Sequence, residues 1–248
     1  MKKIFARYFI FTVGLYLLSL GIVLIIRSAL GTTPISSLNY VLSLNTSLSL
    51  GTCTFIQNMF LIVCQLWLIR GNSSRKKIFE ILMQLPFSFL FGAFIDCNMY
   101  LCNNVTPNSY LASILLLLVG CVVQSTAVVL EVKPNVVMMS AEGFVKYASD
   151  RYDKEFGKIK RKFDIFLVVL AVLTSLVMSK HIEGVREGTV IAALITGTIV
   201  TFISQKLLTR HNYERIRNIK DKGINKDMSP ESEFKAFGIF LFAIIRML

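Results

Sequence analysis

The stretch Ile26–Asn39 reads IRSALGTTPISSLN, and in it a long apolar segment gives way to a short polar one. Gly31 and Pro34 interrupt the apolar run. Thr33 is suited to cap a new helix whose first turn takes Pro34, where a missing N–H costs nothing. A second break, EVKPN at residues 131–135, follows a later apolar run and precedes another short amphipathic segment. The sequence therefore predicts two copies of one unit, each with a single break.

Composition and charge distribution predict an integral membrane protein. Hydrophobic residues make up 54% of the 248-residue chain and charged residues 17%, against about 25% in soluble domains. The charges cluster between long apolar runs, as they must in a chain that crosses a bilayer. The net charge of +12 fits basic cytoplasmic loops. No basic face on a soluble domain indicates a nucleic-acid partner.

Six apolar runs are each long enough to span the membrane. They cover roughly residues 8–26, 52–69, 78–99, 111–130, 163–178 and 188–208. Pro86 is expected to kink the third run. The basic start of the chain resembles a secretory signal, but five further apolar runs favour an uncleaved first helix. Lys and Arg gather in the segments that would face the cytoplasm if both termini lie there.

The predicted fold is all-α, with six transmembrane helices in residues 1–208. Repeat one covers 8–100 and repeat two covers 111–208, and a basic cytoplasmic tail with a short apolar end fills 209–248. Because each repeat has three spans, an odd number, the two repeats enter the membrane in opposite directions, as in many secondary transporters.

A short helix is predicted after the first span of each repeat, at about residues 34–44 and 135–150. Two arrangements are open. The short helices either enter the membrane with N-terminal N–H groups directed toward an anion, or lie flat at the two membrane surfaces.

Polar and charged residues near the breaks are the candidate substrate-binding residues, because a charge buried in a membrane is costly unless it is paired or hydrated. They are Arg27, Gly31, Thr32, Thr33, Pro34, Asp96, Gln124, Glu131, Pro134 and Asn135. Arg27 and Asp96 both fall near the predicted outer ends of their helices, where the two could form an ion pair. The alternative for Arg27 and Lys133 is a side chain that snorkels to the interface.

Small residues at four-residue spacing predict where helices approach closely. One such stripe is Ser88, Gly92 and Asp96, and the other is Gly184, Gly188, Ala192 and Thr196. Within the apolar runs, Gln57, Asn58, Gln84 and Gln124 are expected to form hydrogen bonds between helices. The stripes also permit homo-oligomers without requiring them.

Enzyme signatures are missing from the sequence. It has no H-E-x-x-H, G-x-S-x-G, P-loop or G-x-G-x-x-G motif, so we expect neither an enzyme nor a protein that uses ATP. The five cysteines form no C-x-x-C pair and lie far from both histidines, so neither a metal nor another cofactor is expected. A disulfide between Cys97 and Cys102 is left open.

The segment ALGTTP at residues 29–34 resembles the small-x-Gly-x-x-Pro motif of the YczE/YitT-like bacterial integral membrane proteins. Gly51 and the segment GVREGT at 184–189 also fit. The resemblance covers roughly residues 5–208. It implies a multi-span protein of the bacterial inner (plasma) membrane and implies no catalytic residues. Ile35 and Ser36 stand where the family usually has an acidic or aromatic residue.

The two breaks within an inverted repeat favour a secondary transporter or permease for a small solute. The alternative is a membrane scaffold or sensor that binds a partner through its cytoplasmic loops and tail. The expected partners are therefore the lipid bilayer and an unidentified small solute.

Overall fold

A computed structural model gives the fold, which is described here for residues 2–70, 74–132 and 137–207. Over these ranges the chain is helical and contains no β-strand. The helices are α1 (Lys2–Arg27), α2 (Pro34–Asn45), α3 (Leu50–Leu68), α4 (Arg75–Leu82), α5 (Gln84–Leu101), α6 (Tyr110–Val132), α7 (Ser140–Tyr152), α8 (Phe156–Ser179) and α9 (Glu187–Leu207). The predicted tail, 209–248, lies outside the described residues.

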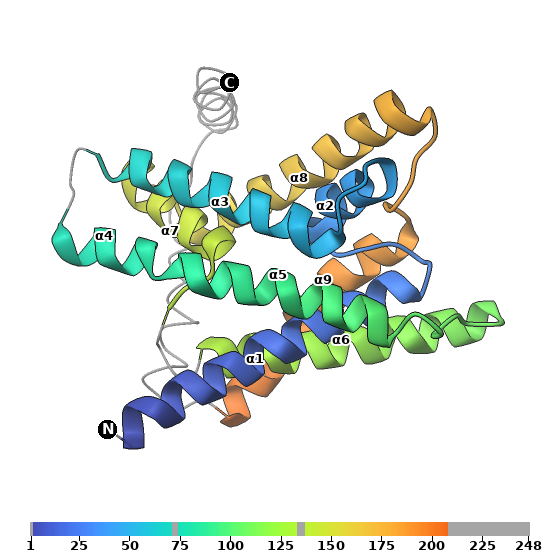
Figure 1. Ribbon diagram of the computed structural model, residues 1–248, viewed down its shortest axis with the longest axis horizontal. Helices are drawn as coiled ribbons and strands as arrows, with labels where there is room; N and C mark the ends of the chain where they lie inside the picture. Colours follow the sequence, from blue (N-terminus) through green and yellow to red (C-terminus); the bar gives the residue numbers. More distant parts are fainter. Residues whose placement is uncertain (1, 71–73, 133–136, 208–248) are drawn as a thin grey trace.

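The long helices alternate in direction (Figure 1): α1, α5 and α8 run one way, whereas α3, α6 and α9 run the other. In the described part, five segments are long and apolar enough to cross a membrane, with α4 and α5 together forming one of them. In α9 the apolar stretch Glu187–Val200 is shorter than a full span. The sixth crossing therefore stays a prediction.

The third apolar run is interrupted where Pro86 predicts a kink. α4 ends at Leu82 and α5 begins at Gln84, with only Met83 between them. Pro86 has no N–H to donate, and its ring crowds the carbonyl group four residues earlier, which belongs to Leu82. A regular helix through this point is therefore disfavoured, and it is interrupted at Met83.

The first short helix begins where the sequence predicts it to begin. Thr33 is the N-cap of α2 and Pro34 is its first residue. The Thr33 hydroxyl donates to the Ser36 hydroxyl over 3.0 Å, and the cap makes no side-chain bond to a backbone N–H.

The second short helix begins later than predicted, at Ser140 instead of Asn135. Met139 is extended, and the Ser140 carbonyl accepts a hydrogen bond from Gln65 in another helix. This tertiary contact fixes the start of α7, which a rule based on the position of Pro134 cannot foresee. Pro134 and Asn135 themselves lie outside the described residues.

α1 and α6 form a closely packed antiparallel pair. A Cβ atom added at Gly14 would lie 3.0 Å from the Glu131 nitrogen, and one at Gly21 would lie 2.7 Å from the Gln124 Cβ. As positions rise along α1, their neighbours fall along α6, so the two helices run in opposite directions. The glycines allow the backbones to come this close.

The remaining helices pack around this pair and around the two short helices. α5 packs on α1, and α9 packs on α6. α2 packs on α8 and α3, and α7 packs on α3 and α8. The packing of α2 therefore corresponds to that of α7, with α3 and α8 exchanged.

Both predicted small-residue stripes lie at close contacts. A Cβ atom at Gly51 of α3 would lie 2.1 Å from the Gly92 carbonyl oxygen of α5. A Cβ atom at Gly188 of α9 would lie 2.6 Å from the Leu30 carbonyl oxygen. Cys97 and Cys102 are both free thiols, so the disulfide left open by the sequence is not formed.

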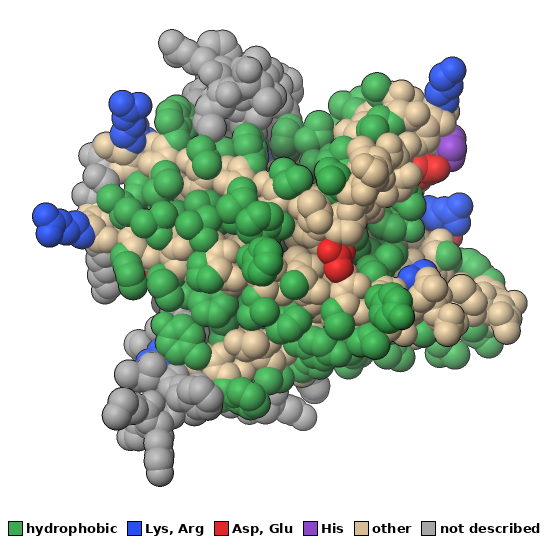
Figure 2. Space-filling view, viewed as in Figure 1, with side chains coloured by type: hydrophobic (Ala, Val, Ile, Leu, Met, Phe, Trp, Pro, Cys, Tyr) green, Lys and Arg blue, Asp and Glu red, His purple; other side chains and the backbone are tan. Residues whose placement is uncertain are grey.

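Hydrophobic side chains cover the flanks of the helices, and most Lys and Arg side chains lie at the ends (Figure 2). Phe89 and Leu111 are each 67% exposed, and Leu194 is 69% exposed. Apolar exposure this broad is rare on soluble monomers and is what contact with lipid requires.

Candidate functional site

The polar face of α2 is directed into the protein. Ser36, Ser37 and Asn39 are buried, and Asn39 is only 2% exposed. A helix lying flat on a membrane would turn its polar face to water. Here that face packs inside the bundle, where α2 contacts α3 and α8. The short helix thus supplies hydroxyl and amide groups to the interior.

Two side-chain amides in this region, those of Asn39 and Asn58, each have one atom without a hydrogen-bond partner. Asn39 Nδ2 donates to the Thr54 hydroxyl over 3.3 Å, but Asn39 Oδ1 accepts nothing. Asn58 lies one turn beyond Thr54 on α3, and its Nδ2 donates to nothing. A buried polar atom without a partner costs about 1–3 kcal/mol. Each of these two atoms would therefore be stabilised by a hydrogen bond to a water molecule or a polar ligand.

Farther along α3, Gln65 and Gln84 form a reciprocal pair. Each Nε2 donates to the other Oε1, over 2.9 and 3.0 Å. Gln65 Nε2 also donates to the Ser140 carbonyl over 3.1 Å, and the Ser140 and Ser88 hydroxyls lie 3.2 Å apart. The network joins α3 and α5 to the first turn of α7. Together with Asn39, Thr54 and Asn58, it extends a polar strip along α3.

The first break packs against the start of α9. Gly31 has φ +138°, and a Cβ atom there would lie 2.5 Å from Thr189 Oγ1. Thr32 N donates to Thr189 Oγ1 over 3.1 Å, and the Thr32 hydroxyl donates to the Gly184 carbonyl over 3.2 Å. Segments 29–34 and 184–189 therefore contact each other. Gly31 and Thr32 form this contact between the two segments and do not face open space.

Arg27 and Asp96 do not pair with each other in the structure. Arg27 Nη2 donates to the Met99 carbonyl over 2.8 Å. Asp96 accepts from the Ser49 hydroxyl over 2.6 Å and from Gly51 N over 2.7 Å. The first N–H groups of α3 have no partner within their own helix and attract a carboxylate. Asp96 accepts from one of these N–H groups, whereas Arg27 Nη2 donates to a carbonyl at the end of α5 and Arg27 Nε is buried without a partner.

Gln124 and Glu131 lie on the buried side of α6. Gln124 Oε1 has no partner, and the Gln124 side chain contacts Gly21. The Glu131 carboxylate accepts a hydrogen bond from the Met139 backbone and is close enough to Glu142 for their charges to interact. Two neighbouring carboxyl groups can share or exchange a proton. Glu142 was not predicted as a site residue from the sequence, although it is the one acidic residue in the first turn of α7.

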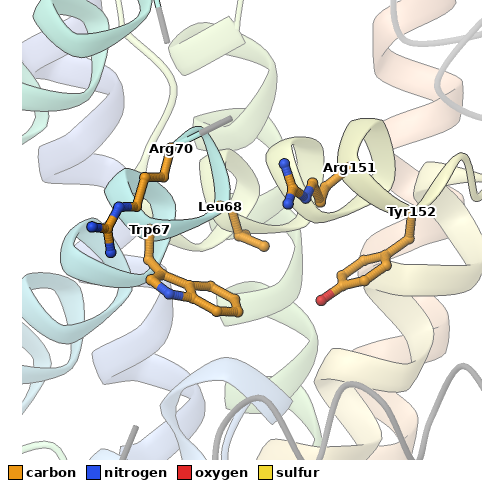
Figure 3. A pocket seen from close by; sticks show the side chains of 5 residues that line it. All are labelled: Trp67, Leu68, Arg70, Arg151 and Tyr152. Carbon is orange, nitrogen blue, oxygen red and sulfur yellow. The ribbon is translucent and has the colours of Figure 1, made fainter. Parts of the chain in front are cut away.

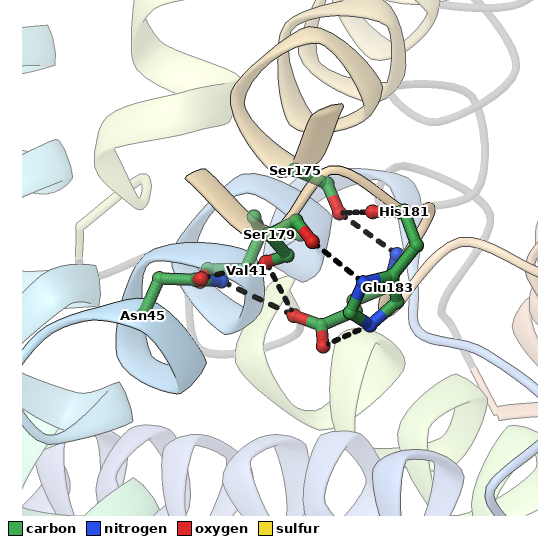
Figure 4. A network of polar contacts seen from close by, with 6 residues as sticks. All are labelled: Val41, Asn45, Ser175, Ser179, His181 and Glu183. Atoms are coloured by element: carbon green, nitrogen blue, oxygen red, sulfur yellow. Dashed lines mark hydrogen bonds and ion pairs between the residues drawn. The ribbon is translucent and has the colours of Figure 1, made fainter. Parts of the chain in front are cut away.

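Another polar network joins α2 to the loop after α8 (Figure 4). Glu183 accepts from Ser179 over 2.9 Å and from Asn45 over 3.2 Å, and it lies 2.7 Å from His181 Nε2. The hydrogen bond from Ser179 does most to lower the pKa of Glu183 below 4.5, followed by the bond from Asn45 and the charge of His181. The sequence does not predict this contact, because nothing in the short loop around Glu183 indicates that it would bind α2.

A pocket of about 400 Å³ opens where α3 and α7 end (Figure 3). Its lining residues are Trp67, Leu68, Arg70, Arg151 and Tyr152. None of them was predicted from the sequence, because the two parts of the pocket come from opposite halves of the chain. The pairing of exposed guanidinium groups with aromatic rings is suited to an anionic group.

Apolar flanks, alternating long helices and a polar interior define the class as an α-helical integral membrane protein. The chain belongs to a family of unknown function, DUF6198, which it matches over residues 5–205. It is also similar to the uncharacterized protein YyaS of Bacillus subtilis (strain 168), with 32% identity over 130 residues. That match covers 51% of this chain and 61% of YyaS, which is less than two thirds of the relative. No solved structure matches the chain. The resemblance to YczE/YitT-like proteins stays a prediction.

Proposed function

We propose that the protein is a secondary transporter for a small polar solute, which passes between two inverted repeats. The first repeat comprises α1, α2, α3 and α4–α5, and the second comprises α6, α7, α8 and α9. α1 and α6, the first helices of the repeats, pack antiparallel. The contacts α2–α8 and α1–α5 recur as α7–α3 and α6–α9. A two-fold axis in the membrane plane would produce this correspondence.

The observation that carries the proposal is the buried polar strip. Asn39 Oδ1 and Asn58 Nδ2 lack partners, and Gln65 on the first repeat donates to Ser140 on the second. The strip therefore reaches the interface at which the repeats would move against each other. The strip consists of hydroxyl and amide side chains, so we expect a solute that is bound by hydrogen bonds and carries no net charge.

Alternating access predicts that the strip opens to each side of the membrane in turn. The experiment uses single cysteines, Ser36→Cys and Ser140→Cys, in a background without the five native cysteines. Membrane-impermeant thiol reagents are applied to vesicles of both orientations. We expect each cysteine to react from both sides, at different rates. The matched control is Val177→Cys, because Val177 is 82% exposed on the apolar exterior and should not react with a charged reagent.

Reaction of each cysteine from one side only, under all conditions, would contradict alternating access. A second arm separates transport from the scaffold alternative. Asn39→Ala should abolish solute uptake in a screen with reconstituted vesicles, whereas deletion of residues 211–248 should leave uptake intact. The reverse result, with loss only after the deletion, would favour a scaffold or sensor.

A further inference from the structure

The pocket between the ends of α3 and α7 combines two aromatic rings with two guanidinium groups. Trp67 and Leu68 are the last residues of α3, Arg70 follows shortly after, and Arg151 and Tyr152 end α7. In Figure 3 the Trp67 and Tyr152 rings lie on opposite sides of the pocket, with Leu68 between them. The pocket therefore has an apolar floor and a cationic edge.

Neither arginine side chain is neutralised by another described residue. The ion pairs found between described residues are Lys158–Glu155, Lys160–Asp164 and His181–Glu183, and none of them includes Arg70 or Arg151. No acidic side chain lines the pocket. A planar guanidinium group binds phosphate oxygens through two parallel hydrogen bonds. The charge of the pocket thus fits an anion, and no carboxylate lines the pocket that could pair with the ammonium group of a zwitterionic headgroup.

The apolar exterior of α3 leads directly to this pocket. Ile56, Phe60, Val63 and Trp67 are each between 40% and 55% exposed. Their spacing places them on one side of the helix, where they form an apolar stripe that ends beside Arg70. Trp and Tyr favour the headgroup level of a membrane, where an apolar ring meets a polar surface. A molecule that fits both parts has an apolar chain and an anionic head.

We propose that this pocket binds the phosphate headgroup of an anionic phospholipid. Arg70 and Arg151 bind the phosphate oxygens, and an acyl chain lies along the stripe from Trp67 to Ile56. The lipid comes from the leaflet at the end of the bundle that carries Arg70 and Arg151. This assignment does not depend on transport, because the pocket lies at the end of the polar strip and shares no residue with it.

The test uses Trp67, because the chain contains one tryptophan. Purified protein in detergent micelles is titrated with phosphatidylglycerol brominated on its acyl chains, and in parallel with brominated phosphatidylcholine. Bromine quenches tryptophan fluorescence on contact. We expect the anionic lipid to reach half-quenching at a lower mole fraction. Each basic residue near an anionic surface contributes about 1 kcal/mol, so R70Q/R151Q should raise that mole fraction about thirtyfold.

The matched control is R75Q/R161Q, which removes two exposed charges at the same end of the protein without changing the pocket. Its half-quenching point should stay that of the wild type. An equal rise in this control would mean that general surface charge attracts the lipid, and would overturn the proposal. Equal quenching of the wild type by both lipids would overturn it too.

Excess inorganic phosphate distinguishes a lipid from a soluble ligand. Phosphate should leave the quenching by brominated phosphatidylglycerol unchanged, since it lacks the acyl chain that the stripe holds. Protection by phosphate would instead assign the pocket to a soluble phosphate compound. If R70Q/R151Q does not remain monodisperse, R70K/R151K keeps the charge and removes the paired hydrogen bonds. A half-quenching point identical to wild type in this variant would overturn the bidentate contact.

Discussion

Gln65 and Gln84 donate to each other over 2.9 and 3.0 Å, and Gln65 donates in addition to the Ser140 carbonyl. Three helices from both halves of the chain meet at this pair. All the atoms involved are buried, so an amide that loses its partner here has no bulk water to replace it.

Gln84→Leu should destabilise the protein by about 1–2 kcal/mol, because it leaves Gln65 Oε1 without a donor. The measurement is the midpoint of thermal unfolding in detergent micelles. Gln57→Leu is the matched control, since Gln57 lies on the same helix as Gln65 but is only half-buried. The double variant Gln65→Leu/Gln84→Leu should cost less than the two single variants combined, and strict additivity would contradict the pairing.

Gly31→Ala should destabilise the protein by about 1–3 kcal/mol. Two effects act together: φ is +138°, and the new methyl group would lie 2.5 Å from Thr189 Oγ1. The control is Gly157→Ala in α8, where an added Cβ atom has nothing within 4 Å and alanine suits the helix. Thermal unfolding compares the two. A larger loss in Gly157→Ala would show that the contact between 29–34 and 184–189 is not formed.

Asp96→Asn should cost about 1 kcal/mol and Asp96→Ala more, because asparagine keeps one acceptor for the first turn of α3 whereas alanine keeps none. Asp150→Asn serves as the control at an exposed position. The same unfolding assay applies. If Arg27→Gln destabilised the protein as much as Asp96→Ala does, an ion pair between Arg27 and Asp96 would explain the result better than the contact with α3.

The Glu183 network predicts a loss of stability in acid. Ser179, Asn45 and His181 lower the pKa of Glu183 in the folded protein below 4.5. The resulting stabilisation is complete above about pH 4.5 and disappears as the pH falls through the folded pKa, because the unfolded chain takes up the proton first. The wild type should therefore lose its stability advantage over Glu183→Gln as the pH falls below about 4.5. The measurement is the midpoint of thermal unfolding of both proteins at a series of pH values.

The sequence predicted the features that depend on local chemistry. The long helices follow from uninterrupted apolar length, and the start of α2 follows from Thr33 and Pro34. The interruption before Pro86 follows from its missing N–H. Each of these needs only a few neighbouring residues, so one sequence is sufficient.

The features that depend on a distant partner could not be predicted. The polar face of α2 is buried because α3 and α8 cover it, and residues 34–45 alone do not predict which helices will pack against them. Asp96 binds the start of α3 and not Arg27, because unpaired backbone N–H groups compete for the same carboxylate. α7 begins at Ser140 since Gln65 and Ser88 bind there.

The close crossing of α3 and α5 at Gly51 and Gly92 makes α1, α5 and α3 a continuously packed series. In the second half, α9 packs on α6, and over the described residues α8 has no comparable packing against α9. The two halves therefore differ in how their third helix is held: α5 links α3 to α1, whereas α8 packs on α2 and α7.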